Sequence, residues 1–264
     1  LTDGPGLDQR RARSLLAQDL DQLEEQAQGY AGAAKVQVAG PWTLAATVEK
    51  PRGDKVLADH GARRELAQAL AEGVGAHVAE VRRRLRGVDR LVVQVDEPAL
   101  ARVLAARVPT ASGLGWHRAV DLPEASEALG WVLGAVAAAG GEPWVHSCSP
   151  GTPPALLHGA GASGLSVDPT VLDASGLDAL AEAAESGAVL ALGVLPSAEP
   201  VPRPTAAQVA DSALRWLDLL GLDPDEAGDR VVLTPTCGLA GASPRWAQDA
   251  HALLVRAVTH LQQG

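Results

Sequence analysis

The sequence of 264 residues lacks several common residue types. It contains no Met, Phe, Ile or Asn, and aromatic residues make up only 3% of it. The core must therefore be built from Leu, Val and Ala, with some of the six Trp residues. Because no initiator Met is present, we expect the sequence to begin downstream of the start of its gene.

Long apolar runs and an excess of basic charge are also missing. The longest apolar stretches are broken by Gly, Arg or Asp within about a dozen residues, which is too short to span a bilayer. No charged leader followed by an apolar stretch opens the chain. The net charge of −10, from 22 basic and 32 acidic residues, argues against binding to nucleic-acid phosphates. We therefore expect a cytoplasmic protein with no membrane or nucleic-acid partner.

Short runs rich in Val and Leu alternate with Ala- and Leu-rich segments of helical periodicity. The runs predict strands at 35–39, 91–96, 143–148, 164–168, 189–194 and 230–235. The periodic segments predict helices at 8–28, 59–86, 122–140, 153–160, 172–186, 205–220 and 244–262. Near-continuous apolar strands are typical of a parallel sheet buried on both faces. The pattern thus predicts an α/β fold of the TIM (β/α)8-barrel type, as a single domain over residues 1–264.

Six strands are too few to close a standard eight-stranded barrel. We therefore expect the first two β/α units to precede the first residue of this sequence. The strand at 35–39 should then have an unoccupied edge, or be covered by residues outside the sequence.

The two cysteines of the chain both end predicted strands. Cys148 lies in WVHSCSP and Cys237 in LTPTCGLAG, while Asp168 ends the strand in GLSVD. His146 and Cys148 are two residues apart on a strand, so their side chains point to the same face. Barrel active sites are built from such strand ends, and one nitrogen, two sulfurs and a carboxylate suit tetrahedral zinc. The sequence therefore predicts a Zn²⁺ site of His146, Cys148, Asp168 and Cys237.

Other interpretations of these residues remain open. In one interpretation, the two cysteines are buried structural residues and the histidine is a core residue with its hydrogen bonds satisfied. In another, a Cys–His pair acts as a nucleophile and its base. A structural disulfide is disfavoured by a reducing compartment.

Five strand-end phrases also occur in an order that resembles a known family. They resemble the signature segments of the catalytic C-terminal barrel of cobalamin-independent methionine synthase, in its short single-barrel form. The phrases are GPWTLA (40–45), QVDEPAL (94–100), HSC (146–148), LSVD (165–168) and TPTCGL (234–239). The resemblance implies transfer of a methyl group to the thiol of homocysteine, which makes methionine.

The family's motifs also imply roles for individual residues here. Its zinc ligands fall on His146, Cys148 and Cys237, with Asp168 in place of the family's Glu. The acidic residue that holds the amino group of homocysteine falls on Asp96, which we take as the catalytic and substrate-binding residue. Its neighbour Glu97 is also predicted to bind substrate.

The methyl donor is implied to be methyltetrahydrofolate or a methylcorrinoid. The family's catalytic His lies in a D-I-H-S phrase after the seventh strand, whereas GVLPSAEP (193–200) contains no His. An N-methyl donor has a poor leaving group that needs a proton, so this difference favours a methylcorrinoid or a small methylated donor as a hypothesis. Two other functions stay open: a metal-free enzyme resembling uroporphyrinogen decarboxylase, and a non-catalytic zinc-binding relative.

Overall fold

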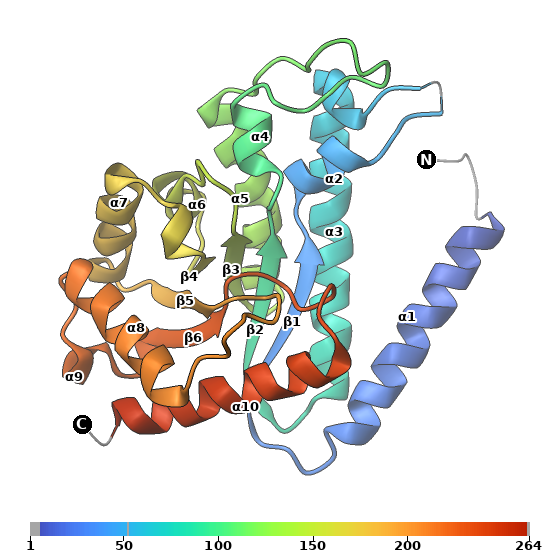
Figure 1. Ribbon diagram of the computed structural model, residues 1–264. Helices are drawn as coiled ribbons and strands as arrows, with labels where there is room; N and C mark the ends of the chain where they lie inside the picture. Colours follow the sequence, from blue (N-terminus) through green and yellow to red (C-terminus); the bar gives the residue numbers. More distant parts are fainter. Residues whose placement is uncertain (1–5, 52, 263–264) are drawn as a thin grey trace. The chain divides into compact units, whose positions relative to one another are not determined.

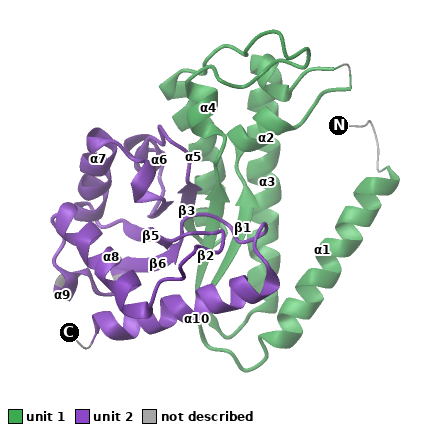
Figure 2. Cartoon of the chain, viewed as in Figure 1, with its two compact units in different colours: residues 1–144 green, residues 145–264 purple. Residues whose placement is uncertain are grey.

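The computed structural model describes residues 6–51 and 53–262 of the chain (Figure 1). The chain forms two compact units, Leu1–Trp144 and Val145–Gly264 (Figure 2). The boundary between them falls inside strand β3, Glu142–Ser147. The assignment of residues 1–264 to one barrel domain stays a prediction.

The first unit contains two parallel strands and their connecting helices. Strands β1 (Gly32–Ala39) and β2 (Val88–Asp96) pair in parallel, and Ala39 lies opposite Asp96 at their carboxyl ends. The helices are α1 (Leu7–Gln26), α2 (Pro41–Thr47), α3 (His60–Arg84), α4 (Leu100–Leu104) and α5 (Leu122–Ala138), with a 3-10 turn at Val56–Ala58. Helices α3 and α5 pack against each other.

Close packing fixes how β2 meets these two helices. A Cβ on Gly141 would lie 2.9 Å from Val93 of β2, 3.0 Å from Val136 of α5 and 3.3 Å from Val78 of α3. Glycine is therefore required where the three elements converge just before β3. One face of the β1–β2 pair is thus covered by helices.

Helix α1 makes few apolar contacts within its unit. The predicted helix is confirmed, but Leu15 and Leu16 are about half exposed and Leu20 is its buried residue. Arg84 at the end of α3 bonds to Asp21 of α1 at 2.6 Å. Charge as well as apolar packing therefore links α1 to α3.

The second unit carries the remaining parallel strands in sequence order, β3-β4-β5-β6. The strands after β3 are β4 (Gly164–Val167), β5 (Val189–Leu195) and β6 (Val231–Pro235). The helices are α6 (Pro154–Gly159), α7 (Ala174–Glu185), α8 (Ala206–Leu219), α9 (Pro224–Ala227) and α10 (Pro244–Leu261), with 3-10 turns at Pro169–Val171 and Gly228–Arg230.

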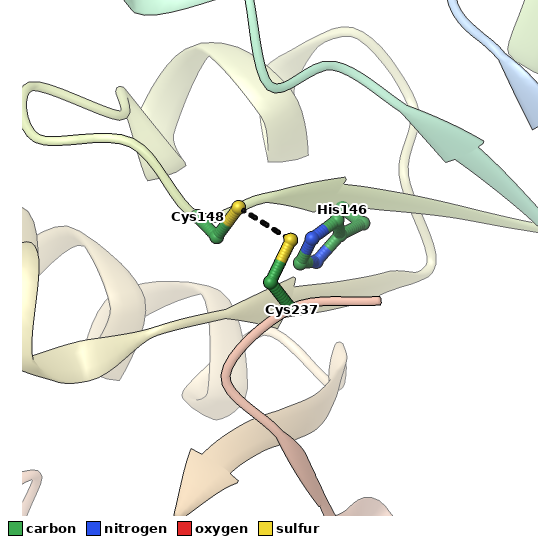
Figure 3. A group of neighbouring side chains, drawn as sticks. All are labelled: His146, Cys148 and Cys237. Atoms are coloured by element: carbon green, nitrogen blue, oxygen red, sulfur yellow. Dashed lines mark hydrogen bonds between the residues drawn. The ribbon is translucent and has the colours of Figure 1, made fainter. Parts of the chain in front are cut away.

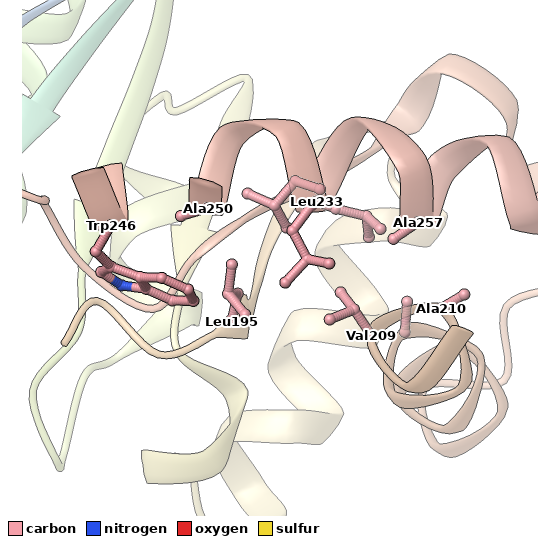
Figure 4. Close-up of a cluster of buried hydrophobic side chains, with 10 residues drawn as sticks. Leu195, Val209, Ala210, Leu233, Trp246, Ala250 and Ala257 are labelled. Carbon is pink, nitrogen blue, oxygen red and sulfur yellow. The ribbon is translucent and has the colours of Figure 1, made fainter. Parts of the chain in front are cut away.

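The core of this unit lies between α8, α10 and residues of β5 and β6 (Figure 4). Trp246 at the start of α10 is 1% exposed, and its indole N–H donates to the carbonyl of Ser197 at 3.0 Å. Ala213 and Ala257 allow α8 and α10 to approach closely. With aromatic residues so scarce, Trp246 supplies much of the volume that this core requires.

The alternation of strands and helices confirms the α/β class with parallel strands that a TIM-type barrel uses. All six predicted strands and seven predicted helices are present, with ends displaced by three residues or fewer. The short helices α2, α4 and α9 were not predicted. Among the described residues, no helix combines the length and the apolar character needed to cross a lipid bilayer.

Strand β1 differs from the expectation of strands buried on both faces. Its side chains alternate between half-buried and exposed along its whole length, and among the described residues it pairs only with β2. The expected unoccupied edge is therefore present. Barrel closure and the two preceding β/α units remain predictions.

Candidate functional site

Three of the four predicted metal ligands converge in the second unit (Figure 3). His146 is the penultimate residue of β3, Cys148 directly follows that strand, and Cys237 lies two residues after β6. The ligand atoms that these three side chains offer all lie within 4.8 Å of one another. Donor atoms on one tetrahedral zinc are about 3.5–4 Å apart, so the group can close around a single ion with small side-chain movements.

The two sulfur atoms are in direct contact. The Cys148 thiol donates a hydrogen bond to Cys237 Sγ at 3.1 Å, and both cysteines are free. Cys148 is half-buried and Cys237 is exposed, so the interpretation as two buried core cysteines is wrong. Burial and the contact with Cys237 raise the pKa of Cys148 to about 12. Two thiolates repel each other at this distance, and a bound divalent cation would remove that penalty.

His146 is held in one orientation by β4. The residue is 7% exposed, and its Nδ1 lies 3.0 Å from the carbonyl oxygen of Ser166 and 3.2 Å from the Ser166 hydroxyl. A carbonyl oxygen only accepts hydrogen bonds, so Nδ1 carries the proton in this contact. The lone pair of the ring is then on Nε2. This is the arrangement that a metal-binding imidazole uses, with the other nitrogen bonded to the protein.

Asp168 lies at the end of β4 but is not one of the clustered ligands. Its Oδ1 accepts from the Thr170 amide at 3.0 Å and from the Thr170 hydroxyl at 2.6 Å, which caps the following 3-10 turn. It is near enough to contribute to the raised pKa of Cys148. The role of Asp168 as a fourth ligand therefore stays a prediction. It requires the carboxylate to give up its hydrogen bonds with Thr170.

The first unit places Asp96 at the end of a polar chain of side chains. Gln94 Nε2 donates to Asp96 Oδ1 at 2.7 Å, and Lys35 Nζ donates to Gln94 Oε1 at 2.9 Å. Asp96 ends β2 and Lys35 lies on β1. The carboxylate that was predicted to hold an amino group therefore has a fixed orientation before any substrate arrives.

Glu97 is engaged entirely within the protein. It is 0% exposed; its Oε1 accepts from the Trp42 amide at 2.8 Å, and its Oε2 accepts from the Thr43 amide and hydroxyl, each at 2.8 Å. Burial raises its pKa to about 7, against the effect of these hydrogen bonds. Its observed role is to hold the start of α2. A contact between Glu97 and substrate stays a prediction.

Glycine at position 40 is required by the same contact. A Cβ there would lie 2.3 Å from Glu97 Oε1, which is inside the contact distance of any real side chain. The segments GPWTLA and QVDEPAL are therefore coupled in the structure. The second supplies the buried carboxylate of Glu97, and the backbone amides of the first donate hydrogen bonds to it.

Sequence reasoning missed three residues that orient the site. Ser166 positions His146, while Gln94 and Lys35 position Asp96. A signal was available for Gln94 and Ser166, because each is a buried polar residue between apolar neighbours. Such a residue needs a partner when the strand is buried.

Comparison with known families finds a match over most of the chain. Residues 30–260 match the family model described as "Cobalamin-independent synthase, Catalytic domain". No curated protein sequence matches the chain.

Solved structures of two distant enzymes resemble it. Dihydropteroate synthase of Xanthomonas albilineans in complex with indole-2-carboxylic acid and 6-chloroguanine is 17% identical, with a TM-score of 0.44; the match covers 88% of this chain and 66% of that one. The same enzyme with 4-aminobenzoic acid is 16% identical, with a TM-score of 0.45 and coverage of 86% and 67%. The carboxyl transferase domain Y628A of Rhizobium etli pyruvate carboxylase with pyruvate is 14% identical, with a TM-score of 0.29 and coverage of 67% and 32%. The family model matches well over half of the chain, and the chain belongs to the family of cobalamin-independent synthase catalytic domains.

Proposed function

We propose that this member of the family is a zinc-dependent methyltransferase that moves a methyl group to the thiol of homocysteine to make methionine. Family membership supports methyl transfer to homocysteine as the activity. The observation that carries the zinc dependence is the convergence of His146, Cys148 and Cys237 within 4.8 Å, with the sulfurs 3.1 Å apart.

These residues fit a zinc ion by the chemistry of their donor atoms. Thiolate sulfur and imidazole nitrogen are the ligands that zinc prefers, and three protein ligands leave a position for a substrate thiol. A free alkyl thiol is only a few per cent thiolate at neutral pH, and zinc supplies the charge that converts a bound thiol to the nucleophilic thiolate. Asp168 is the proposed fourth residue that would hold the ion.

The remaining chemistry belongs to the protein's own side chains. Ser166 keeps the His146 ring turned so that Nε2 is available, which maintains the ligand geometry through the reaction. Asp96 is proposed to bind the amino group of homocysteine, and Gln94 holds its carboxylate in place.

The methyl donor is proposed to be methyltetrahydrofolate or a methylcorrinoid. The segment 193–200 contains no histidine that could protonate a folate leaving group. A methylcorrinoid needs less help from an acid, and we propose it as the better donor.

Metal content and thiol methylation, measured on the same reduced preparation, test the proposal. We expect about one zinc per chain and methionine formed from homocysteine with one of the two donors. Cys237→Ser should lose most of both while keeping its helical circular dichroism, because Cys237 is exposed and contributes little to the core. The matched control for the histidine ligand pairs His146→Gln with His251→Gln on the exposed side of α10.

Each of the other outcomes would overturn a different part of the proposal. Methyl transfer without bound zinc would overturn the zinc dependence. Zinc without methyl transfer to any thiol would indicate a non-catalytic relative. Neither zinc nor transfer would favour a metal-free enzyme of the decarboxylase type. Zinc retained by Cys237→Ser would refute the ligand assignment.

A further inference from the structure

In the second unit, the end of β5 lies against the bend that carries Cys237. Strand β6 ends at Pro235, two residues before Cys237, and the chain bends at Thr236. The Thr236 amide donates to the carbonyl of Leu195, the last residue of β5, at 2.8 Å. One residue before Cys237, the chain is therefore fastened to the end of the neighbouring strand.

A pair of hydroxyl groups makes a second contact between the two loops that follow β5 and β6. Ser197 Oγ and Thr236 Oγ1 lie 3.1 Å apart, and both residues are half-buried. A hydroxyl group both donates and accepts, so either residue can supply the proton of this hydrogen bond. The backbone of Ser197 is fixed in turn, because its carbonyl accepts the indole N–H of Trp246, which lies in the core of the unit (Figure 4). The hydroxyl pair thus ties Thr236 to a loop that the core holds in place.

The lack of a side chain at position 193 allows the bend to approach β5 this closely. Gly193 of β5 lies opposite Thr234 of β6. A Cβ on Gly193 would lie 2.7 Å from the Cα atom of Thr236 and 3.0 Å from the carbonyl oxygen of Val167. Both are backbone atoms, which cannot turn aside as a flexible side chain can, so glycine is required here for close approach.

These contacts determine where Cys237 lies. Cys237 is exposed, so burial of its own side chain contributes little to fixing it. Its sulfur nevertheless lies 3.1 Å from Cys148 Sγ (Figure 3). We infer that the segment at the end of β5 positions Cys237 as a metal ligand, with Gly193 and the Ser197–Thr236 hydroxyl pair as positioning residues. This inference rests on the proposed function, because it requires that Cys237 holds a metal.

The inference gives a role to the segment 193–200, in which no histidine occurs. A ligand that is held in place before the metal arrives loses little freedom when the metal binds. Contacts that orient a ligand therefore contribute to metal affinity without touching the ion. The segment would act on the metal centre through Cys237.

Zinc affinity, measured by competition with a chelator, tests the hydroxyl pair. Thr236→Val removes the hydroxyl and keeps the shape of the side chain, and we expect the zinc affinity to fall by about 10- to 100-fold. Ser197→Ala should have the same effect, and the double variant should be no worse than Thr236→Val, because the two hydroxyls act on each other. Thr236→Ser keeps the hydroxyl and should restore the affinity. The matched control, Thr259→Val on the exposed side of α10, should leave it unchanged.

The thiol pair gives a readout that needs neither metal nor turnover. In the metal-free protein, oxidised glutathione converts the two thiols to a Cys148–Cys237 disulfide and is itself reduced to two molecules of the thiol. The equilibrium constant measures the effective concentration of one cysteine beside the other. Thr236→Val and Ser197→Ala should lower this constant by about 10-fold, as loss of one orienting hydrogen bond does. A general loss of stability in a chain that remains folded would not change it.

A glycine variant displaces the same bend without removing a hydroxyl. Gly193→Ala should lower both the zinc affinity and the disulfide constant, because its methyl group pushes the Thr236 backbone away. Its control is Gly159→Ala in α6, where no atom lies within 4 Å of the added Cβ. If Thr236→Val or Gly193→Ala does not fold, Ser197→Ala carries the test, since it removes one oxygen from a half-buried loop residue.

The failures of the two proposals are distinguishable. Hydroxyl variants that keep the wild-type zinc affinity and disulfide constant would overturn this inference while the proposed function stands. A lower zinc affinity with an unchanged disulfide constant would also overturn it, because the hydroxyls would then not act through Cys237. A wild-type chain that binds no zinc would overturn the zinc dependence together with this inference.

Discussion

The buried contact between Gly40 and Glu97 allows a test of how the start of α2 is held against the end of β2. We expect Gly40→Ala to destabilise the protein although only one methyl group is added. Gly40 has φ −80°, which any residue adopts, so backbone strain makes no contribution. The effect must come from the added Cβ, which would lie 2.3 Å from Glu97 Oε1 and 2.5 Å from its carboxyl carbon.

The magnitude follows from what must move. Relief of the overlap requires Glu97 to shift by about 1 Å, and overpacking of this kind costs about 1–3 kcal/mol. A shift of that size also breaks contacts with Trp42 and Thr43, and a buried acceptor left without its donors costs about 1–3 kcal/mol more. Because the two costs overlap, we expect a loss of about 2–4 kcal/mol.

Urea denaturation followed by circular dichroism measures this loss, with Gly134→Ala as the matched control. Gly134 lies inside α5 and has no atom within 4 Å of its would-be Cβ. The control should therefore stabilise the helix by about 0.5–1 kcal/mol, the ordinary gain of Ala over Gly. If Gly40→Ala is as stable as Gly134→Ala, then Glu97 does not occupy this position and the link between α2 and β2 is wrong.

Two further predictions concern acidic residues. Burial raises the pKa of Glu97 to about 7, so the stability that its protonated form contributes is complete below pH 4.5 and is lost as the pH rises through 7. This loss is about 3 kcal/mol, and Glu97→Gln should flatten that part of the stability profile; an unchanged slope would refute the assignment. Asp168→Glu lengthens the carboxylate arm, and we expect tighter zinc binding in a competition titration with a chelator; unchanged affinity would show that position 168 does not contribute a ligand.

The order of elements was predictable because the apolar periodicity is strong. Val-rich runs such as 91–96 and the Ala/Leu helices between them define strands and helices within a few residues. The short helices α2, α4 and α9 were missed because four to seven residues give no measurable period. Helix α2 forms because Glu97, far away in the sequence, binds the amides at its start.

The candidate site was predictable to the extent that strand ends determine it. His146 and Cys148 share a face by their spacing, and Cys237 meets them because β6 ends beside the same group. The orientation of Asp168 could not be predicted from the spacing of the motif. Its carboxylate accepts hydrogen bonds from the amide and hydroxyl of Thr170, and this local contact competes with metal binding. Side-chain networks such as the one through Gln94 depend on cross-strand register, which a single sequence does not reveal.

The separation of the thiol pair along the chain has a consequence for folding. Cys148 and Cys237 are 89 positions apart, and between them lie β4, β5 and β6 of the second unit. An ion bound by both sulfurs would cross-link the two ends of this segment, and the cross-link could be removed with the ion. For a loop of that length the chain-entropy model gives a stabilisation of about 4–5 kcal/mol, of the same order as a disulfide. If an ion is held there as proposed, its removal by a chelator should destabilise the second unit as well as abolish the proposed activity.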